Sequence, residues 1–219
     1  MTQLLSTPHA GGRLASGFLT GKSAIDVAMH TRYGMIHGRF QPFHLGHFHY
    51  ALTAAQRCAH LIVGITNPDP SCIVAEATDP ERHRPEANIF TFFERQQMIR
   101  AALTEAGLDE QRISFVPFPI HHPERWRYYC PPDALHFLRV FSAWGQEKMR
   151  RFQEMGWRVE VLDAGARKDM SGSEVRRRLR AGQGWEELVP PAVAEVLREI
   201  GAVERLSGQQ GAGNGEQGK

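Results

Sequence analysis

The chain has 219 residues, 42% of them apolar, which is enough for one domain with a sizeable core. Its 26 basic and 24 acidic side chains nearly balance, so the charge favours neither a nucleic acid nor a membrane surface as partner. Three widely spaced cysteines argue against a disulfide framework or a thiolate zinc site and fit a reduced compartment. No run is long and apolar enough to cross a bilayer, so we expect a cytoplasmic protein, and the composition leaves a homo-oligomer open.

The two ends of the chain differ from its middle. Residues 1–30 are predicted to be an N-terminal extension, partly flexible because of its glycines, with a short helix at Ala24–Met29. Residues 207–219 are rich in Gly and Gln and are predicted to be a disordered tail, since they offer little apolar surface to bury. The folded domain is therefore expected at residues 31–206.

Strand-like and helix-like runs alternate through this domain. In chain order, the pattern predicts a strand at 35–37, a helix at 48–59, a strand at 61–65, a helix at 92–106, strands at 113–118 and 135–141, a helix at 145–155, a strand at 157–162, and helices at 171–181 and 191–200. This order indicates an α/β fold, a Rossmann-like parallel sheet with helices on both faces, in a single domain with C-terminal helices. The ligand cleft is expected at the carboxyl ends of the strands.

The run GRFQPFHLGH, residues 38–47, lies where the first strand passes into the first helix. A helix N-terminus offers unpaired N–H groups and a partial positive charge, which suit phosphate. Gly38 and Gly46 let the backbone approach a ligand closely, while Arg39 and the two histidines add hydrogen-bond donors. The run therefore predicts a phosphate site.

A second run, RKDMSGSEVR at residues 167–176, has the chemistry of an anion site. Ser171 and Glu174 form an S-x-x-E capping box, so a helix is expected to begin there. Its N–H groups, its serine hydroxyls and Arg176 can bind phosphate oxygens. The neighbouring Arg177 and Arg178 are expected on a solvated helix face.

Residues 38–47 resemble the signature of the H-x-G-H nucleotidyltransferase superfamily, most closely that of archaeal-type nicotinamide mononucleotide adenylyltransferases. Residues 170–176 are similar to the second signature of that family, I-S-G-T-x-I-R, with M-S-G-S in place of I-S-G-T. Residues 88–95 look like its N-P-F-T-x-x-E-R segment. The resemblance covers roughly residues 34–200.

The resemblance implies transfer of AMP from ATP to nicotinamide mononucleotide, giving NAD and pyrophosphate. It implies catalytic roles for His44, His47, Arg39 and Arg176. Mg²⁺ would be held mainly through the triphosphate, without a protein metal site. Acceptor contacts would come from Trp126, stacked on the nicotinamide, and from Asn88 and Arg95. The implied nucleotide contacts are Gly38, Arg39, Phe40, Gln41, His44, Gly46, His47, Arg167, Ser171, Gly172, Ser173 and Arg176.

Two aromatic residues leave alternatives open. Trp144 stands where the family has a short turn near the adenosine, so the base or the acceptor can differ. Trp126 can equally be a core or lid residue. The first alternative is a CTP-dependent cytidylyltransferase acting on a small phosphorylated or phosphonate acceptor. The second is a non-catalytic nucleotide-binding sensor, which the retained histidines and Arg176 disfavour.

Overall fold

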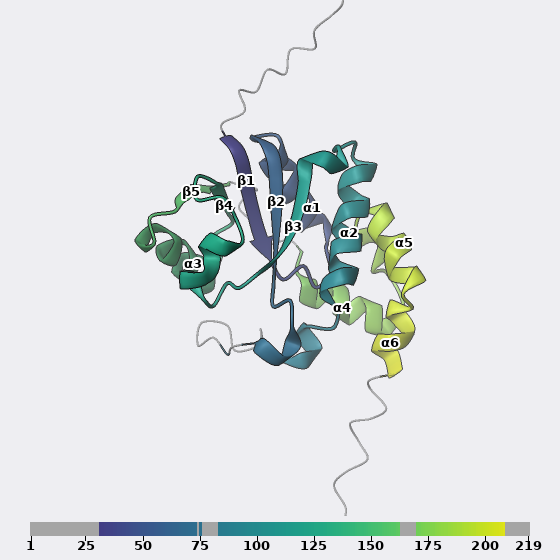
Figure 1. Cartoon of the computed structure of the whole chain (residues 1–219). Helices are drawn as coiled ribbons and strands as arrows, with labels where there is room; N and C mark the ends of the chain where they lie inside the picture. The colour runs from purple at the N-terminus through teal and green to yellow at the C-terminus, as the bar shows by residue number, and fades with distance from the viewer. Residues whose placement is uncertain (1–30, 74, 76–82, 163–169, 209–219) are drawn as a thin grey trace, which may run out of the picture.

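A computed structural model describes residues 31–73, 75, 83–162 and 170–208. The predicted helix at Ala24–Met29, Arg167 and most of the predicted tail lie outside these residues. Within them, five strands form one parallel sheet in the order β3-β2-β1-β4-β5 (Figure 1). The strands are β1 (Thr31–Gly38), β2 (Cys58–Thr66), β3 (Ile113–Phe118), β4 (Leu135–Leu138) and β5 (Arg158–Val161). The predicted α/β Rossmann-like fold is confirmed.

The first five helices follow the predicted order with shifted ends, whereas a sixth was not predicted. They are α1 (Leu45–Ala55), α2 (Phe92–Glu105), α3 (Ala143–Glu154), α4 (Gly172–Ala181), α5 (Pro191–Glu199) and α6 (Ala202–Gly208), with 3₁₀ turns at Pro70–Cys72, Pro85–Ala87, Glu110–Arg112, Pro123–Tyr128 and Glu186–Leu188. The first helix begins three residues before the predicted position 48, because His44 caps it. It ends at Ala55 rather than 59, since β2 already begins at Cys58. The fourth strand ends at Leu138 rather than 141, and α6 includes the first two residues of the predicted tail.

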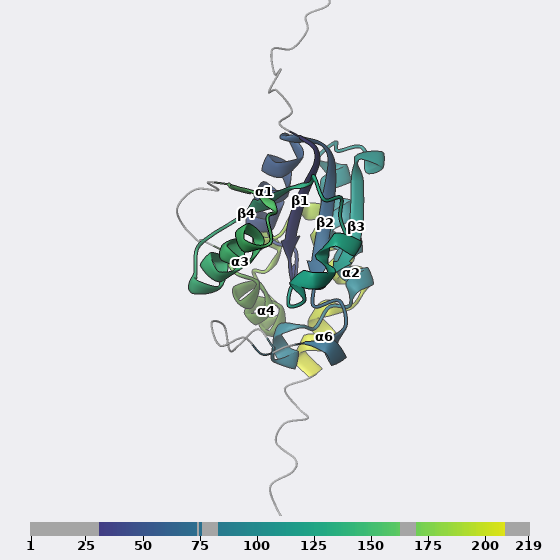
Figure 2. The same ribbon diagram turned by 60° about the vertical axis from the view of Figure 1, so that its left-hand side comes forward.

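Helices cover both faces of the sheet (Figures 1 and 2). On one face, α1, α2, α4, α5 and α6 pack over Ile36, Leu61 and Val63 in the larger core. On the other face, α3 and the segment after β3 pack over Met35 and Ile62 in a smaller core. Adjacent strand residues thus enter opposite cores, as expected of central strands buried on both sides.

The sheet order creates a switch point beside β1. The chain moves from β1 to β2 and β3 on one side, then crosses to β4 and β5 on the other. Connections that leave in opposite directions open a crevice at the carboxyl ends of the two central strands. The loop after β1 and the loop after β4 meet at this crevice.

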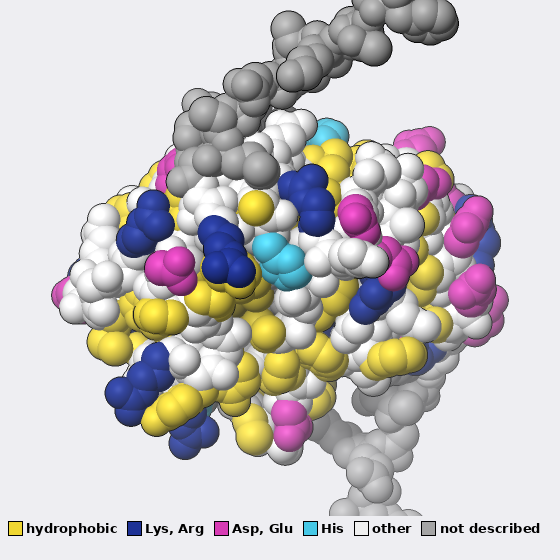
Figure 3. All heavy atoms as spheres, turned by 45° about the horizontal axis from the view of Figure 1, so that its top comes forward, with side chains coloured by type: hydrophobic (Ala, Val, Ile, Leu, Met, Phe, Trp, Pro, Cys, Tyr) yellow, Lys and Arg dark blue, Asp and Glu magenta, His cyan; other side chains and the backbone are white. Residues whose placement is uncertain are grey.

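The surface at the opposite end of the sheet is mixed in charge. Figure 3 looks onto the end where the strands begin, and Lys and Arg side chains are interspersed there with Asp and Glu. Such a mixture offers no continuous basic face for a polyanion. Among the described residues, no helix has the length and apolar character needed to span a membrane.

Candidate active site

A cavity of about 220 Å³ opens at the carboxyl ends of β1 and β4. Three stretches of chain line it, one following β1, one following β4, and one at the start of α4. Most of the predicted nucleotide-binding residues are among its walls, namely Gly38, Arg39, Phe40, Gln41, His44, His47, Ser171, Gly172, Ser173 and Arg176. The structure thus brings two sequence motifs more than 120 residues apart into one site.

The loop after β1 is held by buried polar contacts. The Gln41 side chain donates to the Phe90 carbonyl oxygen at 2.9 Å and accepts from the Phe90 N–H at 2.8 Å. Phe40, 1% exposed, adopts the left-handed conformation with φ of 52°. A non-glycine residue in that region needs surrounding support, which its packing against Phe43 and His47 supplies. This loop, residues 39–44, is called the phosphate loop below because its motif predicts a phosphate site. Its contacts with the rest of the protein fix its shape before a ligand binds.

His44 and His47 lie at the start of α1, with their rings stacked at a centroid distance of 3.7 Å. His44 is the N-cap of the helix, and its Nδ1 accepts from the His47 N–H at 3.3 Å. Burial first, and then the neighbouring His44 and the charge of Arg139, hold the pKa of His47 well below its usual range. A neutral imidazole at the helix N-terminus can donate one N–H to a phosphoryl oxygen.

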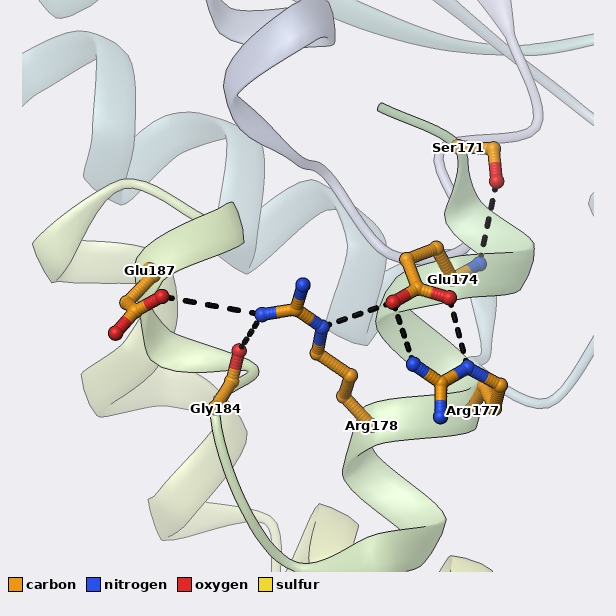
Figure 4. A network of polar contacts seen from close by, with 6 residues as sticks. All are labelled: Ser171, Glu174, Arg177, Arg178, Gly184 and Glu187. Atoms are coloured by element: carbon orange, nitrogen blue, oxygen red, sulfur yellow. Dashed lines mark hydrogen bonds and ion pairs between the residues drawn. The ribbon is translucent and has the colours of Figure 1, made fainter. Parts of the chain in front are cut away.

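The start of α4 forms the facing wall of the cavity. Figure 4 shows the polar contacts around the first turns of this helix. The Ser171 hydroxyl accepts from the Glu174 N–H at 3.2 Å, which confirms the predicted N-cap. The Glu174 carboxylate instead receives bonds from Arg177 and Arg178, and Arg178 also donates to the Gly184 carbonyl oxygen. Only the serine half of the capping box is therefore formed. Glu174 instead binds Arg177 and Arg178, the two arginines predicted to lie on a solvated helix face.

Arg176 ties the two motifs together. Its guanidinium donates to the Gln41 carbonyl oxygen at 2.7 Å and to the Ser173 hydroxyl at 3.2 Å. Burial lowers the pKa of Arg176 to about 10, so the group stays charged at neutral pH. It is 6% exposed and lines the cavity, so it supplies fixed positive charge between the phosphate loop and α4.

The opposite side of the cavity contains two basic residues that the motifs did not indicate, Arg139 and Lys148. Arg139 directly follows β4, and it donates to the Gly46 carbonyl oxygen in the first turn of α1. Lys148, on α3, lies 3.4 Å through Nζ from Nδ1 of His37. Trp144, the predicted departure near the base, also lines this side. The position of Arg139 just after the strand next to β1 was the signal that could have identified it.

The residues predicted to bind the acceptor lie elsewhere. Trp126 is fully buried, with its indole 4.1 Å from the Phe152 ring and its N–H donated to the Pro119 carbonyl oxygen. Because its ring is packed inside the smaller core, it offers no face to a nicotinamide. The structure therefore assigns Trp126 to the core.

Asn88 and Arg95 do not line the cavity either. The buried Arg95 guanidinium donates to the carbonyl oxygens of Thr66, Asn67 and Arg39. Asn88 donates to the Arg84 carbonyl oxygen and accepts from Asn67. Both side chains hold the loops after β1 and β2 in place. The predicted nucleotide contact Gly46 is not among the lining residues, and its carbonyl oxygen accepts from Arg139.

A phosphate loop, a facing helix N-terminus and a basic cavity at the switch point of a parallel sheet define a nucleotidyltransferase site. Residues 35–178 match the cytidylyltransferase-like family, and the chain belongs to it. The match covers both motifs and every described residue that lines the cavity.

Two relatives and one solved structure show what the chain is similar to. It is 53% identical over 173 residues to the phosphonoformate cytidylyltransferase of Streptomyces viridochromogenes, covering 79% of this chain and 94% of that protein. It is 34% identical over 174 residues to the nicotinamide-nucleotide adenylyltransferase of Thermococcus kodakarensis, covering 79% and 86%. A solved bifunctional NMN adenylyltransferase/ADP ribose pyrophosphatase from Francisella tularensis shares the fold, with a TM-score of 0.59 and 19% identity over 82% of this chain and 53% of that one.

These comparisons correct the function that the motifs implied. Transfer of AMP from ATP to nicotinamide mononucleotide was expected from the archaeal resemblance, and this prediction is wrong. The cytidylyltransferase is much more similar to this chain than the adenylyltransferase is. The two motifs of this chain suit phosphate, which every nucleotidyltransferase must bind, so they could indicate the chemistry without identifying the base or the acceptor.

Proposed function

We propose that this chain is a CTP-dependent cytidylyltransferase whose acceptor is a small phosphonate that also bears a carboxylate, such as phosphonoformate. The observation that carries the proposal is the 53% identity to a phosphonoformate cytidylyltransferase over nearly its whole length. The basic lining of the cavity is consistent with it, because several basic groups stabilise a ligand with several negative charges.

The fully charged side chains around the cavity are all basic. Arg39, Arg139, Lys148 and Arg176 line it, and no Asp or Glu is among the described lining residues. A nicotinamide ring is cationic and would be repelled by such a lining. A carboxylate in the position of that ring would be attracted to the basic side chains. The charge of the cavity therefore favours an acceptor that is anionic throughout.

The residues of the chain suit direct transfer of CMP. An oxygen of the phosphonate attacks the α-phosphorus of CTP, the bond from that phosphorus to the bridging oxygen breaks, and pyrophosphate leaves with the oxygen. His44 and His47 donate hydrogen bonds to the phosphoryl oxygens, and Arg39 and Arg176 offset their developing negative charge. The fixed loop and α4 hold both anions in line.

Mg²⁺ is proposed to enter with the triphosphate. Within the described residues, no group of three or more His, Cys, Asp or Glu residues could hold a metal ion. Phosphate oxygens and water would supply its ligands, as this ion often prefers. When bound, it would neutralise phosphate charge, while the side chains around the cavity orient the reacting groups.

The proposal is tested by measuring pyrophosphate release with Mg²⁺ and each of CTP, ATP, GTP and UTP. Phosphonoformate and nicotinamide mononucleotide are the two acceptors. We expect release with CTP and phosphonoformate, together with a new ³¹P resonance for the CMP-phosphonate anhydride. Release with ATP alone, or none with any triphosphate and phosphonoformate, would contradict the proposal.

A further inference from the structure

The cavity contains a basic side chain, Lys148, that has no role in the proposed transfer chemistry. His44, His47 and Arg176 belong to the walls formed by α1 and α4, where the phosphoryl groups would lie. Lys148 comes from α3, which covers the other face of the sheet (Figure 2). The cavity therefore has basic groups on both sides of β1.

Lys148 is held by a histidine whose position is fixed. The His37 ring lies nearly parallel to two phenylalanine rings, with centroids 5.4 Å from Phe118 and 4.8 Å from Phe152 and interplanar angles of 13° and 7°, and those two rings also contact each other. Its Nδ1 is 3.4 Å from Nζ of Lys148. The stack fixes the plane of the imidazole, so the direction in which it accepts from the ammonium is also fixed.

The contact requires a neutral imidazole. Burial first, and then the charge of Lys148 and the neighbouring His136, hold the pKa of His37 well below its usual range. A neutral ring that accepts at Nδ1 carries its hydrogen on Nε2. This Nε2 atom is buried and has no partner among the described residues. A buried donor without a partner is unfavourable, so an oxygen from a ligand or water would stabilise it.

We infer that Lys148, positioned by His37, binds the carboxylate of the acceptor while the residues of α1 and α4 hold its phosphonate. The inference rests on the proposed function and names the group that selects the acceptor. In phosphonoformate the carboxylate carbon is bonded directly to the phosphorus, so one small cavity with basic groups on both sides of β1 can bind both anionic groups. Lys148 is then a specificity residue, and His37 is a positioning residue.

The test compares two ligands that differ in the carboxylate. Methylphosphonate keeps the phosphonate and replaces the carboxylate with a methyl group. Dissociation constants for both are measured by calorimetry in the wild-type protein and in Lys148→Met. A hydrogen bond to a charged group corresponds to a preference of about 10- to 100-fold. We expect the wild type to show this preference for phosphonoformate and Lys148→Met to bind the two ligands about equally.

Two further variants separate a binding role from a structural one. Arg150→Met removes the same charge from α3, but Arg150 pairs with Glu147 and Glu154 and does not line the cavity, so it should keep the preference. His37→Phe keeps a ring packed against Phe118 and Phe152 but lacks the acceptor atom. It should raise the KM for phosphonoformate several-fold and leave the KM for CTP unchanged.

The outcomes are distinguishable. If Lys148→Met retains the wild-type preference for phosphonoformate, the inference is overturned while the proposed function stands. If His37→Phe raises both KM values alike, His37 does not position Lys148 for the acceptor. Failure of the wild type to bind or use phosphonoformate would overturn the proposed function itself.

Discussion

His44 combines two tasks in one imidazole. Its Nδ1 caps α1 by accepting from the His47 N–H, so its hydrogen lies on Nε2. The ring is 4% exposed and lines the cavity. A single side chain therefore starts the helix and presents a donor to the phosphate site.

These tasks can be separated by substitution. Asparagine is a good N-cap residue and alanine is a poor one, and neither places an imidazole N–H in the cavity. We expect His44→Ala to lose about 1 kcal/mol of unfolding free energy, and His44→Asn to stay close to the wild type. Both should lower kcat by about 100-fold, as for a lost transition-state donor. Urea denaturation and steady-state kinetics measure the two effects.

If kcat falls in His44→Ala but not in His44→Asn, the loss of kcat follows the loss of stability. That result would contradict a direct role for the ring. The exposed His49 offers the matched control, because it lies on the same helix and does not line the cavity. His49→Asn should leave both quantities unchanged.

At the scale of elements, the contact between α4 and the phosphate loop depends on a glycine. A Cβ atom added at Gly172 would lie 2.7 Å from the Gln41 carbonyl oxygen and 3.2 Å from Nη1 of Arg176. Both distances are shorter than ordinary contacts, and the first involves backbone. The helix can therefore approach the loop this closely only because residue 172 has no side chain.

Gly172→Ala is expected to move α4 away from the loop. Overpacking of this kind lowers stability by about 1–3 kcal/mol. The KM for CTP should rise, because the serine hydroxyls and Arg176 move with the helix. Gly208→Ala is the control, since an added Cβ there would meet no atom within 4 Å. Thermal unfolding and CTP titration measure both effects, and an unchanged KM for CTP would mean that α4 does not contact the triphosphate.

The order of strands and helices could be predicted because central parallel strands are continuous apolar runs. The start of α1 was placed too late, since histidine is not among the usual capping residues. Trp126 was assigned to the acceptor because a sequence does not show that Phe152, from a later helix, covers its ring. Arg139 and Lys148 were missed because their approach to β1 depends on the pairing of β1 with β4.

At the scale of the whole molecule, buried histidines connect stability to pH. His136 is fully buried beneath Phe152 and Trp157, and burial followed by the charge of Lys148 lowers its pKa to about 3. In the unfolded chain the pKa would be near 6.5. Between these values the unfolded state binds more protons, so acid favours unfolding.

Stability should therefore be full above pH 6.5 and decrease as the pH falls toward 3. For His136 alone, the loss between pH 7 and pH 5 is about 2 kcal/mol of unfolding free energy. His37 and His47, whose pKa values are also lowered, act in the same direction. Urea denaturation at the two pH values should show a smaller decrease for His136→Leu than for the wild type. An equal decrease would show that His136 does not contribute.

The bond from Arg176 to the Gln41 carbonyl joins residues 135 positions apart, and it has a consequence during synthesis of the chain. The histidines leave the ribosome early, whereas α4 emerges only when most of the domain has been made. Until then the phosphate loop has no facing wall and no Arg176. An incomplete nascent chain therefore carries the motif without the site, and nucleotide turnover begins only once the sheet and its C-terminal helices have come together.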